Sequence, residues 1–253
     1  MNFDIHYPVL GLIVGFLVGM TGMGGGAIMT PLLMLGMGLP PSIAVGTDLA
    51  YATITKIVGS WQHWRQQTID FSVVFDLALG SVPAALVVTL FLNWLHANNE
   101  ALVDTWLKEG IGFALLLIAL VIIYEVFFKK AHTQVTRYYR KRVIFVGAVG
   151  GVLVGLTSVG SGSLIMAFLV LAAPIPTEKL VGTDITHAVL LVGITALAQL
   201  GLGHVDLVIM LQLLIGSIPG VLIGSRLTPR VPRRTLRLLL AGLLVSSALP
   251  LLH

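Results

Sequence analysis

A cluster of glycines interrupts an apolar run near the start of the chain. Three consecutive glycines, Gly24–Gly26, divide residues 8–38 into apolar halves at 8–20 and 27–38. A helix that crosses a bilayer needs about 20 residues, so neither half is long enough to cross alone. Non-helical backbone is tolerated at membrane depth only where protein buries it or where it lines a wet cavity. A membrane protein that contains this stretch is therefore expected to fold around the break.

The same pattern recurs after a shift of 136 positions without a gap. The shift maps the glycine cluster onto residues 160–162, and Val45-Gly46-Thr47-Asp48 onto Val181-Gly182-Thr183-Asp184. A gapless match that retains so many glycine, proline and aspartate positions predicts a duplicated unit. The expected division is a first transmembrane repeat at 1–128, a basic cytoplasmic loop at 129–142 and a second transmembrane repeat at 143–253.

Composition assigns the chain to the membrane. Hydrophobic residues make up 57% of it and charged residues only 10%, whereas a soluble domain carries about 25% charged residues. Apolar stretches at 71–95, 110–128 and 205–225 have the length of a bilayer crossing. The chain is predicted to be an all-α integral membrane protein that crosses the cell (inner) membrane several times. Because it has no cysteine, disulfides and thiolate metal sites are excluded.

The expected elements follow one plan in both repeats. The first break is followed by helices at 42–64, 71–95 and 109–128, with a polar loop at 96–108, and the second break, within 143–174, is followed by helices at 177–202, 205–227 and 235–252. Each repeat is thus a glycine-broken half-helix hairpin followed by three transmembrane helices.

The basic residues decide how the broken elements cross. They cluster at 129–142 and 226–237. If each broken element crossed once, these clusters would lie on opposite sides of the membrane, which the positive-inside bias disfavours. If each element enters and returns, as a re-entrant hairpin or two short spans, both clusters are cytoplasmic and the repeats are inverted. Inverted repeats with interrupted helices are typical of secondary transporters whose substrate site lies near the midplane.

The two breaks are candidates for an anion site. Each leaves unpaired N–H groups at the start of a half-helix, where the helix dipole favours negative charge. Hydroxyl groups add further donors, although close packing of small residues is the alternative explanation for the glycines. The expected substrate-binding residues are Thr21, Gly24, Gly25, Gly26, Thr47, Thr157, Ser158, Gly160, Ser161, Gly162, Ser163 and Thr183.

Ionisable residues inside predicted helices form a second set, the candidates for proton coupling. They are Asp48, Asp184, His187, Lys56 and Asp76. An ionisable group within a membrane helix is a functional candidate by default, and burial favours the protonated form of a carboxylate. Asp184 and His187 lie three apart, on one helix face. Two alternatives stay open: the aspartates could bind nearby backbone N–H groups, and Lys56 could balance an anion or pair with Asp48 or Asp76.

These motifs carry a family resemblance. The broken helix Gly19–Pro31, the run Ala44-Val45-Gly46-Thr47 and Gly80-Ser81-Val82-Pro83 resemble the sulfite exporter TauE/SafE family of permeases, and His204-Val205-Asp206 and Gly216–Gly220 repeat the pattern. The resemblance implies alternating-access transport of a small sulfur-containing anion (sulfite, a sulfonate or a sulfoacetate-like compound) coupled to protons. Ala167 stands where the first repeat has Pro31, so the two tips are expected to contribute unequally.

Other classes of function are less well supported by the sequence. A channel-like anion facilitator usually needs a continuous polar stripe, and a membrane-embedded enzyme would need paired acid–base groups or metal ligands at characteristic spacing. Neither pattern is present, so no enzymatic activity, metal or cofactor is expected. The net charge of +4 comes with no soluble domain that could bind nucleic acid. The expected partners are the anion, protons and lipid, and a homo-oligomer stays open.

Overall fold

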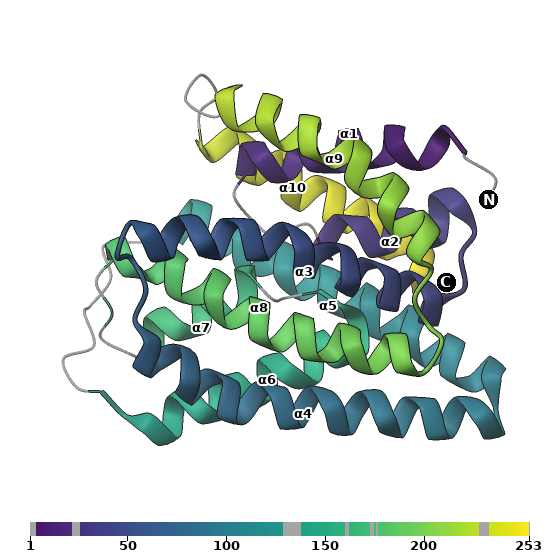
Figure 1. Cartoon of the computed structure of the whole chain (residues 1–253), viewed down its shortest axis with the longest axis horizontal. Helices are drawn as coiled ribbons and strands as arrows, with labels where there is room; N and C mark the ends of the chain where they lie inside the picture. Colours follow the sequence, from purple (N-terminus) through teal and green to yellow (C-terminus); the bar gives the residue numbers. More distant parts are fainter. Residues whose placement is uncertain are drawn as a thin grey trace.

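The computed structural model describes residues 4–21, 26–128, 138–159, 162–172, 175, 177–227 and 233–252. Secondary structure in these ranges is helical throughout (Figure 1). The first repeat contains α1 (His6–Thr21), α2 (Gly26–Met37), α3 (Pro41–Arg65), α4 (Phe71–Asn98) and α5 (Glu100–Phe128). The second contains α6 (Arg140–Thr157), α7 (Ser163–Ala172), α8 (Thr177–Gly201), α9 (Leu207–Leu227) and α10 (Arg233–Ala248), which a short 3₁₀ turn follows at Leu249–Leu251.

Local sequence signals explain where the helices begin. Asp70 precedes α4, and its side chain accepts hydrogen bonds from the backbone N–H groups of Ser72 (3.2 Å) and Val73 (3.4 Å). Asp206, the equivalent residue of the second repeat, does the same for Val208 (2.9 Å) and Ile209 (3.0 Å) at the start of α9. Aspartate at this position satisfies donors that the helix leaves unpaired. The duplication therefore extends to the helix caps.

Five of the described helices are long and apolar enough to cross a membrane: α4, α5, α8, α9 and α10. Helix α3 is not among them, since it carries Asp48, Lys56 and a polar end. Helices α1 and α2 are apolar but shorter. The chain is therefore a multi-pass membrane protein, and both halves of the predicted first break are helical.

One prediction about a loop is wrong. Residues 96–108 do not form a polar loop, because α4 continues to Asn98 and α5 begins at Glu100. The Asn99 side chain accepts a hydrogen bond from the backbone N–H of Leu102 (3.2 Å) and so caps α5. Val103 and Leu107, four residues apart, pack against Leu92 of α4. The polar residues in this stretch obscure an apolar helical face. In the second repeat, α6 begins at Arg140, inside the expected basic loop.

Helices of one repeat pack against helices of the other repeat. Helix α1 packs along α9, and its counterpart α6 packs along α4, the counterpart of α9, while α3 packs along α8. Close backbone contacts repeat with the same shift. A Cβ atom on Gly11 would lie 2.2 Å from the carbonyl oxygen of Leu213, and one on Gly147 would lie 2.2 Å from that of Leu77. Only glycine permits this approach, so these glycines serve packing.

Alanine at Gly147 is expected to destabilise the protein, because its Cβ atom would overlap the backbone of α4. Overpacking of this kind typically costs about 1–3 kcal/mol. Gly242 in α10 has nothing near its Cβ position, so Gly242→Ala is the matched control and should stabilise its helix by up to about 1 kcal/mol. Melting temperatures in detergent measure both. Equal melting temperatures for the two variants would contradict the packing role.

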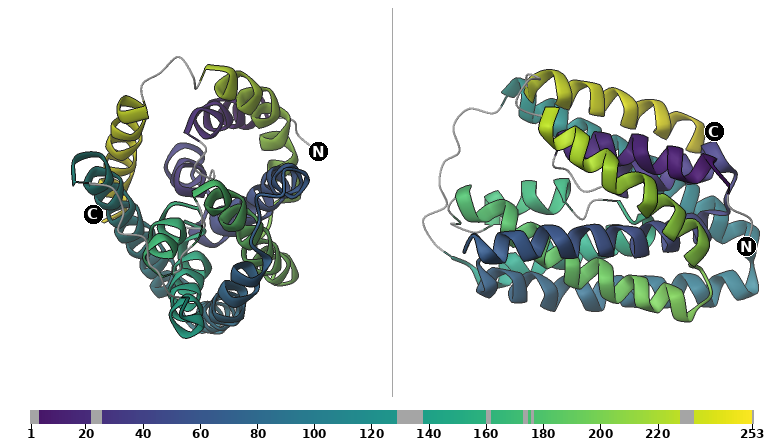
Figure 2. Two further views of the ribbon diagram at one scale, coloured as in Figure 1. Left: turned by 90° about the vertical axis from the view of Figure 1, so that its left-hand side faces the viewer. Right: turned by 45° about the horizontal axis from the view of Figure 1, so that its top comes forward.

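The ends of the helices gather at two opposite ends of the molecule. The beginning of α1 and the end of α10 lie at one end of the molecule, and the C-terminal ends of α3, α5 and α9 lie at the other end (Figure 1). The two further views in Figure 2 show the long helices running side by side, with α10 along one edge. Helices α3 and α8 lie side by side, and together they carry Asp48, Lys56, Asp184 and His187.

Candidate functional site

Two hydroxyl groups from the two broken elements meet on one carboxylate. Oδ2 of Asp48, which is fully buried on α3, accepts hydrogen bonds from Thr30 Oγ1 (2.6 Å) and Ser158 Oγ (2.8 Å). Thr30 lies one turn into α2, and Ser158 directly follows α6. Ser158 adopts a left-handed backbone conformation with φ of 59°, which a residue with a side chain rarely adopts. The left-handed residue ends α6, and its hydroxyl group binds Asp48.

Asp184, the equivalent of Asp48, has a different environment. It is buried on α8, and its Oδ1 atom has no hydrogen-bond partner, which is also true of Asp48 Oδ1. Unlike Asp48, it accepts no hydrogen bond from a hydroxyl group of the described residues. The shift of 136 positions explains the difference, because it replaces Thr30 by Met166 and Ser158 by Gly22, neither of which carries a hydroxyl group. The duplication has therefore placed two carboxylates in the core and provided hydroxyl donors for only one of them.

A histidine and a tyrosine occupy the next equivalent pair of positions. His187 Nε2 lies 2.7 Å from Ser81 Oγ, while its other ring nitrogen, Nδ1, is buried without a partner. In the first repeat the Tyr51 hydroxyl interacts with the Ser217 side chain. Because Ser81 and Ser217 are themselves equivalent, the two contacts repeat one arrangement with different side chains. The histidine differs from the tyrosine in offering two ring nitrogens, one a donor and one an acceptor in the neutral form.

Lys56 adds a cation to this buried set. Its side chain is 7% exposed and is close enough to Asp184 and Asp48 to interact electrostatically with both. The equivalent position of the second repeat is Val192. We call Thr30, Asp48, Lys56, Ser158, Asp184 and His187 the central polar cluster. Its acidic groups outnumber its basic groups, because it has two carboxylates and one lysine.

The structure places other predicted residues in helix-positioning contacts. Oγ1 of Thr47 accepts a hydrogen bond from the backbone N–H of Asp206 (3.0 Å), and Oγ1 of Thr183 accepts one from that of Asp70 (2.9 Å). These bonds hold the starts of α9 and α4 against α3 and α8. Thr157 Oγ1 donates to the carbonyl oxygen of Leu153 (2.7 Å) within α6. All three hydroxyls are thus occupied by backbone groups.

Asp76 lies near the start of α4, bonded to residues before and at the start of α6. It accepts hydrogen bonds from the Tyr138 hydroxyl (2.6 Å) and from Arg140 Nε (2.8 Å). Burial and the neighbouring carboxylate raise the pKa of the Tyr138 phenol. Asp76 therefore ties the start of the second broken element to α4 and is not brought together with Lys56.

Several predicted tip residues fall outside the described part of the chain. These are Gly24, Gly25, Gly160 and Ser161, together with the side chains of Thr21 and Ser163. Gly26 is the first residue of α2, and Gly162 lies in the turn before α7. The anion role of the tips stays a prediction.

Sequence reasoning missed two residues of the site. Thr30 is a single hydroxyl residue in the apolar helix α2, and only its spacing from the glycine break could have indicated it. Ser81 lies in the repeated Gly-Ser-x-Pro motif, which carried the repeat argument but received no chemical role. Within the described residues, no group of three or more His, Cys, Asp or Glu side chains could hold a metal ion.

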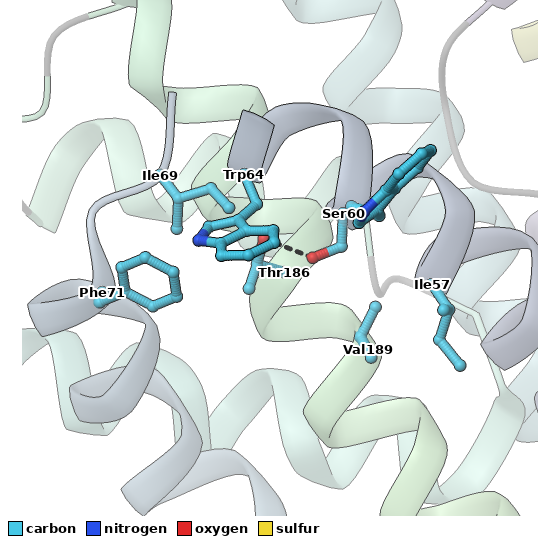
Figure 3. Close-up of a pocket in the computed structure, with 8 residues that line it drawn as sticks. Ile57, Ser60, Trp64, Ile69, Phe71, Thr186 and Val189 are labelled. Atoms are coloured by element: carbon cyan, nitrogen blue, oxygen red, sulfur yellow. Dashed lines mark hydrogen bonds between the residues drawn. The ribbon is translucent and has the colours of Figure 1, made fainter. Parts of the chain in front are cut away.

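A cavity of about 340 Å³ lies between the C-terminal part of α3 and α8 (Figure 3). It is lined mainly by apolar and aromatic side chains, among them Trp64 and Phe71. Its two hydroxyl groups, Ser60 and Thr186, bind each other at 2.9 Å (Figure 3). With no charged residue in its lining, this cavity is a poor site for an anion, and the central polar cluster remains the candidate.

Comparison with known proteins identifies the family of this chain. Residues 7–251 match the profile of the family described as sulfite exporter TauE/SafE. The chain belongs to this family. It is 42% identical over 258 residues to the probable membrane transporter protein YjnA of Bacillus subtilis (strain 168), covering 98% of this chain and 100% of that protein. The probable membrane transporter protein YdhB of the same strain is 28% identical, covering 90% of each chain.

A more distant relative comes from another organism. The probable membrane transporter protein MJ0441 of Methanocaldococcus jannaschii is 25% identical, covering 93% of this chain and 90% of the relative. No solved structure matches the chain significantly. The family membership and the membrane helices together make this protein a multi-pass membrane transporter of the TauE/SafE family.

Proposed function

We propose that this transporter carries a small sulfur-containing oxyanion, such as sulfite, a sulfonate or a sulfoacetate-like compound, across the inner membrane together with protons. The observation that carries the proposal is the meeting of Thr30 and Ser158, from the two broken elements, on the buried Asp48 carboxylate. Buried ionisable groups at the junction of broken helices are where transporters bind substrate and coupling ions.

An inverted-repeat mechanism accounts for the exchanged packing. The pairs α1–α9 and α6–α4 are equivalent under the 136-residue shift, as expected if a two-fold axis in the membrane plane relates the repeats. In this proposal the α1–α2 hairpin enters from the side of both termini and the α6–α7 hairpin enters from the cytoplasm. Alternating access follows when one set of packed helices rocks against the other about the central polar cluster.

The charges of the cluster give a physical reason for coupling. An anion placed beside two ionised carboxylates in a poorly solvated site would be repelled strongly. A proton on Asp184 removes one of these charges, and Lys56 then attracts the anion without competition from that carboxylate. The first turn of α2, which precedes Thr30, adds helix N–H donors. Anion and proton therefore stabilise each other's binding, which is the condition for transporting them together.

Binding is testable on the purified protein. We expect sulfite, thiosulfate or sulfoacetate to raise the melting temperature in detergent, while acetate at the same concentration does not. A ligand at a hundredfold excess over its Kd stabilises the folded state by about 2.7 kcal/mol. In sealed proteoliposomes an inward proton gradient should then drive accumulation of the stabilising anion above equilibrium.

The alternative functions give different outcomes in the same assays. A channel-like facilitator would equilibrate the anion without accumulating it, which would reject proton coupling. If none of the sulfur anions stabilised the protein, the assignment of substrate class would be wrong. The names of the relatives fit a transporter better than a membrane-embedded enzyme.

A further inference from the structure

A line of buried polar side chains leaves the central polar cluster between α4 and α8. On α8, Thr195 and Gln199 follow His187 at intervals of eight and four residues and are 1% and 6% exposed. On α4, Thr89 follows Ser81 by eight residues and, like Thr195, is 1% exposed. Residues spaced by four or eight lie near one face of a helix, and α4 packs along α8. The line runs toward the helix ends near both termini (Figure 1).

A small cavity lies at the outer end of this line. It has a volume of about 20 Å³, and its polar lining includes Thr89, Asn93, His96, Gln199 and His204. A cavity of this size and polarity holds about one water molecule. A sulfur atom bonded to three oxygens does not fit. The cavity therefore suits water and protons and excludes the proposed anion.

The hydrogen bonds along the line are incomplete at both ends. Thr89 Oγ1 near the cavity and His187 Nδ1 in the cluster are buried polar atoms without a partner. Buried polar groups are normally hydrogen-bonded, so such atoms require an explanation. A bridging water supplies the missing partner at nearly the strength of a direct hydrogen bond.

The groups around the cavity can relay a proton. The rings of His96 and His204 meet edge to face with centroids 5.8 Å apart, and His204 Nδ1 lies 2.8 Å from Gln199 Oε1. Burial and the neighbouring His96 lower the pKa of His204, so its ring is neutral at physiological pH and keeps one nitrogen as an acceptor. On α5, Asp104 interacts electrostatically with His96, Glu100 and Lys108. Helix α3 contributes Ser42 and Val45 to the cavity lining.

We infer that this line is the proton pathway between the outer end of the transporter and His187. The inference rests on the proposed proton coupling and adds its route. Between the two polar levels the helices carry the fully buried apolar residues Ala85 and Leu191, over a rise of about 12 Å for eight residues. This apolar layer closes the pathway in the present conformation. Separation of α4 and α8 admits water and connects the two levels.

A leak measurement tests the pathway without any substrate. Purified protein is placed in proteoliposomes that contain a pH-sensitive dye, and the collapse of an imposed pH gradient is followed with no sulfur anion present. Leu191→Ser places a hydroxyl in the apolar layer and is expected to speed the collapse about tenfold over wild type. Adding Thr89→Val, which removes the unpartnered hydroxyl and keeps the side-chain volume, should return the rate to the wild-type value.

Control variants separate the pathway from general damage. Leu197→Ser lies on the exposed face of α8 and should leave the leak unchanged. Leu191→Ala also opens the apolar layer, but without burying a hydroxyl group. It replaces Leu191→Ser in the leak measurement if the serine variant does not yield monodisperse protein. The inference is overturned if neither Leu191 variant leaks faster than wild type, or if Thr89→Val leaves the leak intact. Because the assay contains no anion, failure of the substrate assignment is detected separately.

Discussion

Proteoliposomes containing Asp184→Asn are expected to lose gradient-driven accumulation of the sulfur anion while anion exchange at equal pH continues. Asp184 is buried and accepts no hydrogen bond from a hydroxyl group of the described residues, whereas the equally buried Asp48 accepts two. An ionised carboxylate in that state is costly, so this group gains most from a proton. Asparagine has nearly the same shape and cannot take up the proton. We expect the accelerating effect of the gradient to fall by about a hundredfold or more, in line with losses of proton-transfer groups elsewhere.

Asp76→Asn is the matched control for this experiment. Asp76 is bonded to Tyr138 and Arg140, away from the cluster, so its loss should weaken the contact between α4 and the start of α6 without removing gradient dependence. If Asp184→Asn accumulates anion as wild type does while Asp76→Asn does not, the proton site lies at Asp76. His187→Gln provides a second test, because a relay through His187 requires it to slow coupled transport as well.

The second large effect is expected at Lys56. Lys56→Met removes the cation of the central polar cluster and leaves a side chain of similar length. At a separation of about 4 Å a unit charge contributes about 4 kcal/mol where the effective dielectric constant is near 20. Anion affinity is therefore expected to fall by at least about a hundredfold. Titration calorimetry with the anion that best stabilises wild type measures the change directly.

The duplication itself supplies the control for Lys56. Val192 holds the equivalent position in the second repeat, and Val192→Met introduces the same side chain without changing charge. Removing one member of a buried charged set can also destabilise a protein, so the double variant Lys56→Met/Asp184→Asn restores the charge balance of the set. Wild-type affinity in both the single and the double variant would show that Lys56 does not attract the anion.

Much of the fold could be predicted from the sequence. Apolar length, proline and glycine positions and the caps at Asp70 and Asp206 act within a few residues of the chain. The helices begin and end near their expected positions for this reason. The stretch 96–108 is the exception, because the apolar contacts of Val103 and Leu107 with Leu92 outweigh its polar composition.

By itself, the sequence determined the membrane class, the two broken elements and the duplicated order of helices, since these depend on hydrophobic length and local backbone preference. Only the tertiary structure decided which side chains meet. The carboxylate of Asp48 binds hydroxyl groups that lie 18 and 110 residues away in the sequence, on Thr30 and Ser158. Asp76 forms its ion pair with Arg140, and not with Lys56. Such meetings depend on how α3 packs between the broken elements and α8, and pairwise packing across 110 residues of sequence leaves no local periodic signal.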